Sequence, residues 1–152
     1  MSSTRAVCAV VISAMSLLAT ASCGDGEPAG PVPTAALVAG DYRAAQTVGA
    51  IIFTSTANGE SIDWIAAGAS LTLTLDLGGQ LSGRLFMPGA DENGGDFDEN
   101  MAGTWRIEGG RIRFQQTADT FVRDMPFTFA GGALTGDATF DGVRVRLTLE
   151  RQ

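Results

Sequence analysis

The second half of the chain alternates apolar and polar residues in short segments that are separated by glycine-rich turns. Between positions 70 and 77, leucine occupies every second position and serine, threonine or aspartate the positions between. An alternation with a period of two is typical of a β-strand with one buried face. Dipeptides that favour the positive φ of tight hairpins lie between such segments. They are Gly78-Gly79, Gly109-Gly110, Gly131-Gly132 and Asp141-Gly142.

The alternation predicts eight strands joined as an antiparallel meander. The expected segments are 40–53, 70–77, 81–87, 101–107, 111–116, 125–130, 133–140 and 143–150. Eight antiparallel strands with one polar face can close into a small barrel, whose interior holds side chains or one small ligand. We therefore predict an all-β fold over residues 37–152, an eight-stranded antiparallel up-and-down barrel.

A short helix is expected after the first strand, over residues 62–67. Ser61 is a suitable N-cap, Asp63 lies in the first turn, and Gly68 follows the last residue. Asn58-Gly59 marks a turn just before it. We expect this helix to cover one mouth of the barrel.

The N-terminal residues have the order of an export signal. Arg5 precedes an apolar stretch at 6–18, which is shorter than the roughly 20 residues that a membrane-spanning helix needs. Residues Ala21-Ser22-Cys23 resemble a bacterial lipobox. This resemblance implies a signal peptide at 1–22 and a lipid on Cys23, whereas an ordinary secretory signal would be cleaved near Ala21.

The residues after Cys23 indicate a tether. Three prolines and three glycines lie between Gly24 and Pro33, a composition that favours a flexible linker. Residues 23–36 are therefore expected to join the lipid to the barrel. The lipobox resemblance implies a lipid-anchored protein of the bacterial cell envelope that contacts the membrane only through its lipid. Gly24, next to the cysteine, favours the outer membrane.

Two motifs of the barrel region resemble bacterial lipocalin-like domains. The first strand opens with Gly40-Asp41-Tyr42, and Gly103-Thr104-Trp105 is followed by a Gly-Gly hairpin. The resemblance covers residues 37–152 and implies a barrel that in many relatives binds small apolar molecules. In this family a Gly-x-Trp motif is best known in the first strand, where this chain has Gly40-Asp41-Tyr42.

The amino-acid composition limits the reactions that this protein could catalyse. The chain has no histidine and no lysine, and its two cysteines, Cys8 and Cys23, belong to the signal region. These absences remove the usual general base, the commonest zinc ligand and Schiff-base chemistry. We therefore predict no enzyme activity, no catalytic residues, no metal and no cofactor. The net charge of −7 excludes nucleic acid as a partner and favours neutral, apolar or cationic ones.

The inward face of the barrel leaves two functions open. Gly83, Gly103, Gly136 and Ala138 occupy mid-strand positions, where small residues leave room either for a ligand or for large neighbours. A cavity would bind a small hydrophobic ligand, such as a lipid or fatty acid. Its expected lining residues are Leu73, Trp105, Phe114, Phe127, Phe129 and Leu147. A filled barrel would instead serve as a structural or protein-interaction module, for example with an envelope protein. Its outward arginines are Arg111, Arg113, Arg144 and Arg146.

Two charged segments have further alternatives. The acidic residues at 91–100 lie near glycines, as in Ca²⁺ sites, but their spacing differs from the EF-hand loop, and a solvated loop is the preferred interpretation. Arg123 lies close in sequence to Asp119 and Asp124. It is expected either to pair with them or to meet a ligand carboxylate at the barrel mouth.

Overall fold

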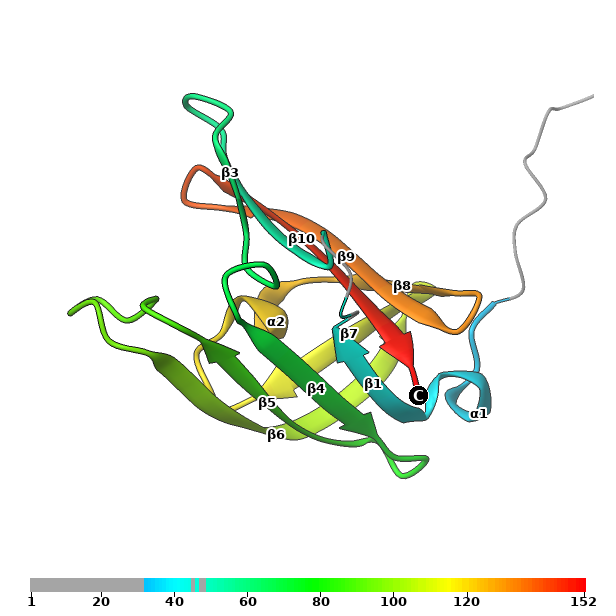
Figure 1. Ribbon diagram of the computed structural model, residues 1–152. Helices are drawn as coiled ribbons and strands as arrows, with labels where there is room; N and C mark the ends of the chain where they lie inside the picture. The colour runs from blue at the N-terminus through cyan, green and yellow to red at the C-terminus, as the bar shows by residue number, and fades with distance from the viewer. Residues whose placement is uncertain (1–31, 45, 47–48) are drawn as a thin grey trace, which may run out of the picture. The chain divides into compact units, whose positions relative to one another are not determined.

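The computed structural model describes residues 32–44, 46 and 49–152 (Figure 1). All the described residues belong to one compact unit, Pro31–Gln152. The predicted signal peptide and Cys23 lie outside the described residues. Helix α1 begins at Ala35, so regular structure starts slightly before residue 37.

Ten strands and two short helices make up the described part of the chain. Their bounds are α1 Ala35–Val38, β1 Gly40–Ala44, β2 Ile51–Ser55, β3 Ser61–Asp63, β4 Ser70–Leu75, β5 Gln80–Met87, β6 Phe97–Glu108, β7 Arg111–Gln116, α2 Phe121–Asp124, β8 Phe127–Ala130, β9 Ala133–Phe140 and β10 Val143–Arg151. None of the described helices is long and apolar enough to cross a bilayer.

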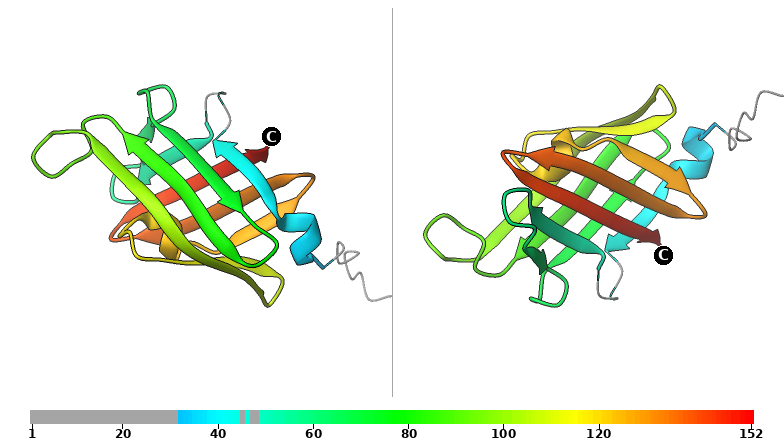
Figure 2. Two further views of the ribbon diagram at one scale, coloured as in Figure 1. Left: turned by 90° about the horizontal axis from the view of Figure 1, so that it is seen from below. Right: turned by 90° about the horizontal axis from the view of Figure 1, so that it is seen from above.

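Eight of the strands form a closed antiparallel ring. The order runs β1-β4-β5-β6-β7-β8-β9-β10, and β1 pairs with β10 to complete the barrel. In Figure 2, strands β4 to β6 cross one side of the barrel and β8 to β10 cross the other at a steep angle. The all-β fold and the closed eight-stranded barrel predicted from the sequence are confirmed.

Three of the four predicted two-residue hairpins are confirmed. Both residues of Gly109-Gly110, Gly131-Gly132 and Asp141-Gly142 have positive φ, as type I′ turns require. The fourth prediction is wrong. Strand β4 ends at Leu75, and a four-residue turn follows in which the Asp76 N–H bonds to the Gln80 carbonyl at 3.0 Å. Leu77, predicted to face inward, is therefore 70% exposed.

The predicted first strand, 40–53, is two strands. β1 and β2 both pair with the same edge of β10, at Leu149–Arg151 and at Val143–Leu147 respectively. Within β2, Ile51 is fully buried and the following residues, Ile52 to Ser55, are partly buried. β2 then pairs with β3 instead of continuing along β4.

The short helix expected after the first strand is a single helical turn that begins two residues late. Ser61 to Asp63 form strand β3, and the Ala67 N–H then bonds to the Asp63 carbonyl at 3.1 Å. Asp63, not Ser61, caps this turn, because its Oδ1 accepts from the Ile65 N–H at 3.0 Å and from Ala66.

One end of the barrel is closed by α1. Val38 is fully buried, its carbonyl accepts a hydrogen bond from the Tyr42 hydroxyl, and the Arg151 guanidinium donates to the carbonyls of Leu37 and Ala39. The barrel interior is lined by a continuous apolar cluster from every strand of the ring. The opposite end carries α2 and the longer connections (Figure 1).

Candidate functional site

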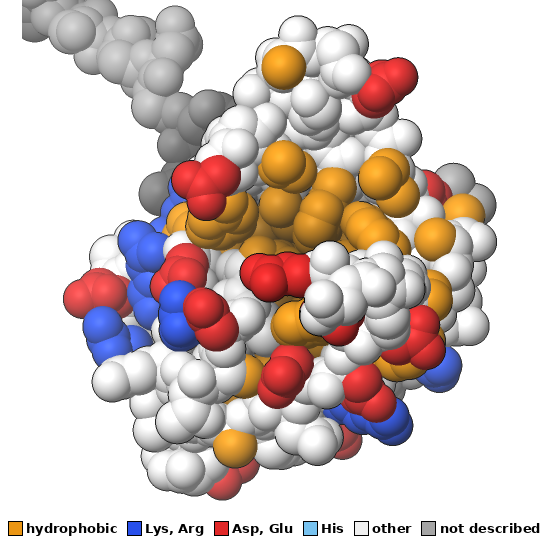
Figure 3. Space-filling view, turned by 90° about the vertical axis from the view of Figure 1, so that its left-hand side faces the viewer, with side chains coloured by type: hydrophobic (Ala, Val, Ile, Leu, Met, Phe, Trp, Pro, Cys, Tyr) orange, Lys and Arg blue, Asp and Glu red, His pale blue; other side chains and the backbone are white. Residues whose placement is uncertain are grey.

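The open end of the barrel, here called the mouth, is the candidate site. Four stretches of chain meet there because antiparallel strands bring alternate connections to the same end. They are residues 56–69, 88–96, 117–126 and 141–142. Figure 3 views this end, where apolar side chains gather in a hollow and carboxylates surround them.

The hollow is a pocket of about 450 Å³, here called the mouth pocket. It is lined by Phe53, Trp64, Met87, Gly89, Ala90, Phe97, Asp119, Thr120 and Phe121. Phe53 comes from β2, Trp64 from the turn after β3, and Phe97 from the start of β6. The pocket is thus built from five separate segments of the chain.

Aromatic side chains form the walls of the mouth pocket. Phe53 packs edge-to-face on Trp64 at 5.8 Å between ring centroids and on Phe121 at 5.2 Å. Phe53, Trp64, Phe121 and the separate Phe97 are each only partly buried. Edge-to-face contacts stabilise aromatic pairs beyond simple burial and hold the rings in fixed orientations. The pocket therefore presents ordered aromatic surface to solvent.

Local hydrogen bonds position Trp64. Asp63 accepts from Ile65 and Ala66 through Oδ1 and from the Gly49 N–H through Oδ2 at 2.8 Å. The Trp64 N–H bonds to the Ile51 carbonyl at 2.9 Å. These bonds tie the turn to β2, so the indole is held beside Phe53.

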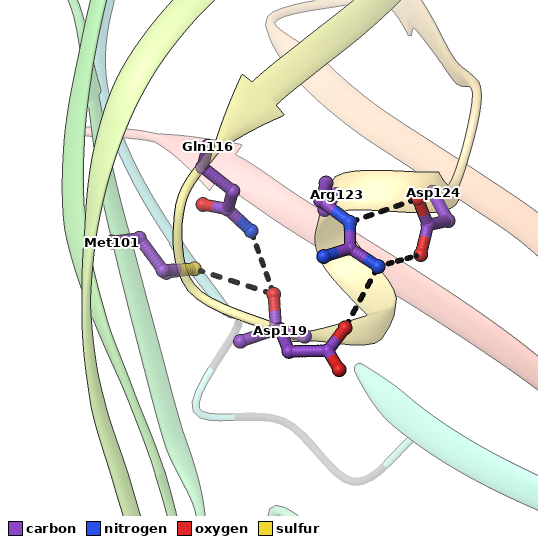
Figure 4. Close-up of polar contacts among 6 residues, drawn as sticks. Met101, Gln116, Asp119, Arg123 and Asp124 are labelled. Atoms are coloured by element: carbon purple, nitrogen blue, oxygen red, sulfur yellow. Dashed lines mark hydrogen bonds and ion pairs between the residues drawn. The ribbon is translucent and has the colours of Figure 1, made fainter.

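A buried polar group lies behind the pocket. Gln116 is only 7% exposed, and its Nε2 donates to the Thr120 hydroxyl at 2.6 Å. The same hydroxyl lies 4.0 Å from the Met101 sulfur. Figure 4 shows Gln116 and Met101 reaching toward this point from β7 and β6. Gln116 Oε1 and Trp64 Nε1 are buried and have no hydrogen-bond partner among the described residues.

Arg123 pairs with both neighbouring aspartates (Figure 4). Its Nη2 lies 2.7 Å from Asp119 and 2.8 Å from Asp124. The hydrogen bond to Asp124 raises the pKa of Arg123, and the same bond lowers the pKa of Asp124. Of the two alternatives for Arg123, the structure therefore shows the ion pair. The Asp119 side chain remains 89% exposed at the pocket rim.

Two carboxylates of the segment 91–100 have separate partners. Asp96 accepts from the Gly89 N–H at 3.0 Å, and Asp98 pairs with Arg84, whose hydrogen bond lowers the pKa of Asp98. Part of the predicted loop, from Phe97 onward, belongs to β6. Among the described residues, no three metal-ligating side chains come together.

The six predicted lining residues belong to the barrel core. Leu73, Trp105, Phe114, Phe127 and Leu147 are buried, and Phe129 is partly buried against them. The Phe114 and Phe127 rings are 4.9 Å apart, and Trp105 donates from Nε1 to the Asp76 carbonyl at 2.8 Å near the closed end. None of the six lines the mouth pocket.

The mid-strand glycines lie against close neighbours. A Cβ at Gly136 would overlap the Met125 sulfur and meet the Phe127 ring at 3.0 Å, and one at Gly83 would overlap the Thr72 carbonyl. The space beside Gly136 is therefore filled by the barrel's own side chains. The sequence left two alternatives for this position, room for a ligand or large neighbouring side chains. At Gly136 the structure shows large neighbouring side chains.

The outward arginines lie on strands β7 and β10. Arg111 donates to the Thr128 hydroxyl at 2.6 Å, and Arg144 pairs with Asp137, which lowers the pKa of Asp137. A shallow groove of about 310 Å³ crosses this surface beside Arg111 and Arg146.

The sequence pattern does not identify the aromatic walls of the pocket. Phe97 and Phe121 stand in charged stretches, and Phe53 ends the segment 40–53, in which apolar residues occur at both odd and even positions. The available signal was an isolated aromatic residue in a polar connection, which is unusual unless something covers it. The expectation that 62–67 lies at the mouth does place Trp64 correctly.

Comparisons with protein families, curated proteins and solved structures return no match for this chain.

Proposed function

We propose that this protein binds a small apolar ligand at the mouth of a barrel whose interior is filled. One observation carries the proposal: four partly buried aromatic side chains surround an open pocket of about 450 Å³. Ligand sites are concave and lined mainly by apolar and aromatic side chains, with volumes of roughly 300 to 1,000 Å³. The mouth pocket fits this description.

Solvent-exposed aromatic surface is itself an argument for a ligand. A contiguous apolar patch rimmed by polar residues marks an interaction site in many soluble proteins. The walls are held by edge-to-face contacts and by the capped turn at Asp63. A preformed pocket loses little conformational entropy on binding, so a ligand gains most of the burial energy.

The proposal places the ligand above the core. The six interior residues expected from the sequence would form the packed base under the pocket, since Met125 and Phe127 fill the space beside Gly136. A ligand of modest size would lie among Phe53, Phe97 and Phe121.

We also propose the cellular location and the family that the sequence led us to expect. A closed eight-stranded barrel is compatible with the lipocalin-like resemblance, and Cys23 with a lipid would hold the barrel at the bacterial cell envelope, in the outer membrane. Binding would then occur close to a source of apolar molecules. The membrane would be contacted through the lipid alone.

The test uses the neutral dye N-phenyl-1-naphthylamine, whose emission rises in apolar surroundings. We expect saturable emission enhancement with residues 24–152. Phe97→Ala removes one wall, and we expect it to weaken dye affinity about tenfold, since losing part of a phenyl contact costs roughly 1 to 1.5 kcal/mol. Ala90→Trp should abolish binding by filling the pocket without removing any wall.

Leu77→Ala is the matched control, because Leu77 is an exposed apolar residue at the other end of the barrel. It should leave dye affinity unchanged. Dye binding that is absent, or equally strong in Ala90→Trp and the parent protein, contradicts the proposal. A structural or protein-interaction role for the filled barrel would then be the better explanation.

A further inference from the structure

The negative charge of the described residues is concentrated at the mouth. The four stretches that meet there contain one arginine, Arg123, against eight carboxylates. These are Glu60, Asp63, Asp91, Glu92, Asp96, Asp119, Asp124 and Asp141. The connections at the closed end, 35–39, 76–79, 109–110 and 131–132, contain one carboxylate, Asp76. Among the described connections, the carboxylates therefore gather at the end of the barrel that carries the pocket; Asp119 lines the pocket, and further carboxylates surround the hollow in Figure 3.

The cations nearest the mouth are already paired. Arg123 is held between Asp119 and Asp124. On the outside of the barrel, Arg84 pairs with Asp98 and Arg144 with Asp137. An anionic ligand head group would have to displace an aspartate from one of these arginines. It would also approach against the field of the surrounding carboxylates, which repels anions and concentrates cations.

The pocket walls also favour a positive charge. The faces of aromatic rings attract cations, tryptophan most strongly, and quaternary ammonium groups are bound in this way. Phe53, Trp64 and Phe121 offer three such rings beside an acidic rim. The carboxylates and the aromatic ring faces therefore both favour a ligand with a positive charge.

The buried polar atoms at the site do not reverse this preference. Gln116 does not line the mouth pocket but is more than nine-tenths buried and donates to Thr120, which does, and its Oε1 is an acceptor with no described partner. An unpaired acceptor favours a positive or donor group nearby. The unpaired Trp64 Nε1–H favours an acceptor on the ligand, but one neutral donor is weak beside several carboxylates.

We infer that the ligand of the mouth pocket is a cationic amphiphile, an apolar chain or ring that carries a positively charged nitrogen. This inference rests on the proposed function and narrows its ligand class. It separates this protein from carriers of fatty acids and other anionic lipids. The apolar part lies against the aromatic walls and the nitrogen faces the acidic rim.

The experiment measures displacement of N-phenyl-1-naphthylamine by three dodecyl compounds below their critical micelle concentrations. They are dodecyltrimethylammonium, the neutral dodecyl maltoside and dodecanoate. We expect half-displacement by the cation at a concentration about tenfold or more below that needed for dodecanoate, and this ratio should shrink as salt screens the rim charges. Thermal unfolding midpoints that are not lowered at these concentrations show that displacement is not denaturation, since a bound ligand leaves the midpoint equal or raises it.

The variant that tests the rim is the double substitution Asp91→Asn and Glu92→Gln. It should reduce the preference for the cation several-fold and leave dye affinity unchanged. Glu108→Gln with Glu150→Gln removes the same charge near the closed end and should preserve the preference. If the dye binds and dodecanoate displaces it as well as the cation does, the inference of a cationic ligand is wrong, but the proposal that the mouth pocket binds an apolar ligand is unaffected. If the dye does not bind, the proposed function itself fails.

Discussion

A single glycine shows how tightly the interior is packed. Gly136 lies in β9 between Phe127 and Leu147, and the Met125 side chain occupies the place where its Cβ would stand. Methionine is unbranched and flexible, so it fills irregular gaps of this kind. Glycine is therefore required here by packing, because its φ is not in the positive range.

Gly136→Leu should destabilise the barrel. Overpacking a filled core costs about 1 to 3 kcal/mol, and we expect a loss of this size in the free energy of unfolding measured with urea. Thr139→Leu is the control, because Thr139 is exposed on the outer side of the same strand and the change there should stay within about 0.5 kcal/mol. A fully stable Gly136→Leu protein would mean that the interior has free space, and the ligand site would then extend into the barrel.

Helix α1 is a secondary-structure element that is stabilised by tertiary contacts. Four residues cannot form a stable helix alone, so tertiary contacts hold this one. Val38 fills the end of the barrel, the Tyr42 hydroxyl donates to its carbonyl, and Arg151 donates to two neighbouring carbonyls. Closure of this end leaves the mouth as the accessible end of the described barrel.

The docking of α1 predicts a pH dependence. Burial raises the pKa of Tyr42 above its ordinary value of 10.0, although the nearby charge of Arg151 acts in the opposite direction. The unfolded chain therefore loses the tyrosine proton at a lower pH than the folded one. Stability from this group is complete below pH 10.0 and is lost as the pH rises through the folded pKa.

Tyr42 is the only tyrosine, so its ionisation can be followed by ultraviolet absorbance alone. We expect the titration midpoint of the folded protein to lie above that of the urea-unfolded protein. Tyr42→Phe should lower stability at pH 7 by about 1 kcal/mol through the lost hydrogen bond and should make stability less steep above pH 10.0. Equal midpoints in the folded and unfolded states would show that Tyr42 is not buried as described.

The first strand shows what periodicity fails to resolve. The β-branched residues of 40–53 predict an extended strand. Its apolar residues occupy both odd and even positions, so periodicity does not show where the strand ends or which face is buried. Strand β1 ends at Ala44, and β2 begins at Ile51 on the same edge of β10 with Ile51 buried. The break depends on pairing with a strand about 100 positions away in sequence. No local signal reports that register.

The whole molecule combines a closed end with an acidic, aromatic mouth. The lipid expected on Cys23 would add a third feature, attachment to the envelope. Replacement of Cys23 by serine should move the protein from the detergent phase to the aqueous phase in Triton X-114 partition, because the lipid supplies the apolar anchor. The mass of the mature parent protein should exceed that of its polypeptide by the added acyl groups.

Cys8→Ser is the matched control, since Cys8 belongs to the predicted signal peptide and should not affect partition. A Cys23→Ser protein that still enters the detergent phase would overturn the lipid anchor. Cleavage near Ala21 with an unmodified Cys23 would support an ordinary secretory signal instead. Neither result would alter the proposal for the mouth pocket, because its test uses residues 24–152.

The sequence by itself determined the strands and most of their turns. Alternation sets which face of a strand is buried, and the positive φ of Gly109-Gly110 or Asp141-Gly142 sets where it reverses, and both are local properties. Because strand number and antiparallel order allow few compact arrangements, barrel closure followed from these local signals.

Only the tertiary structure decided where a ligand has room. Phe53, Trp64, Phe97 and Phe121 meet because four connections end at the same mouth, and each is unremarkable in its own segment of sequence. The same holds for Met125 filling the space beside Gly136. Pockets and packed interiors arise from contacts between residues distant in the chain, and no local periodicity encodes those distances.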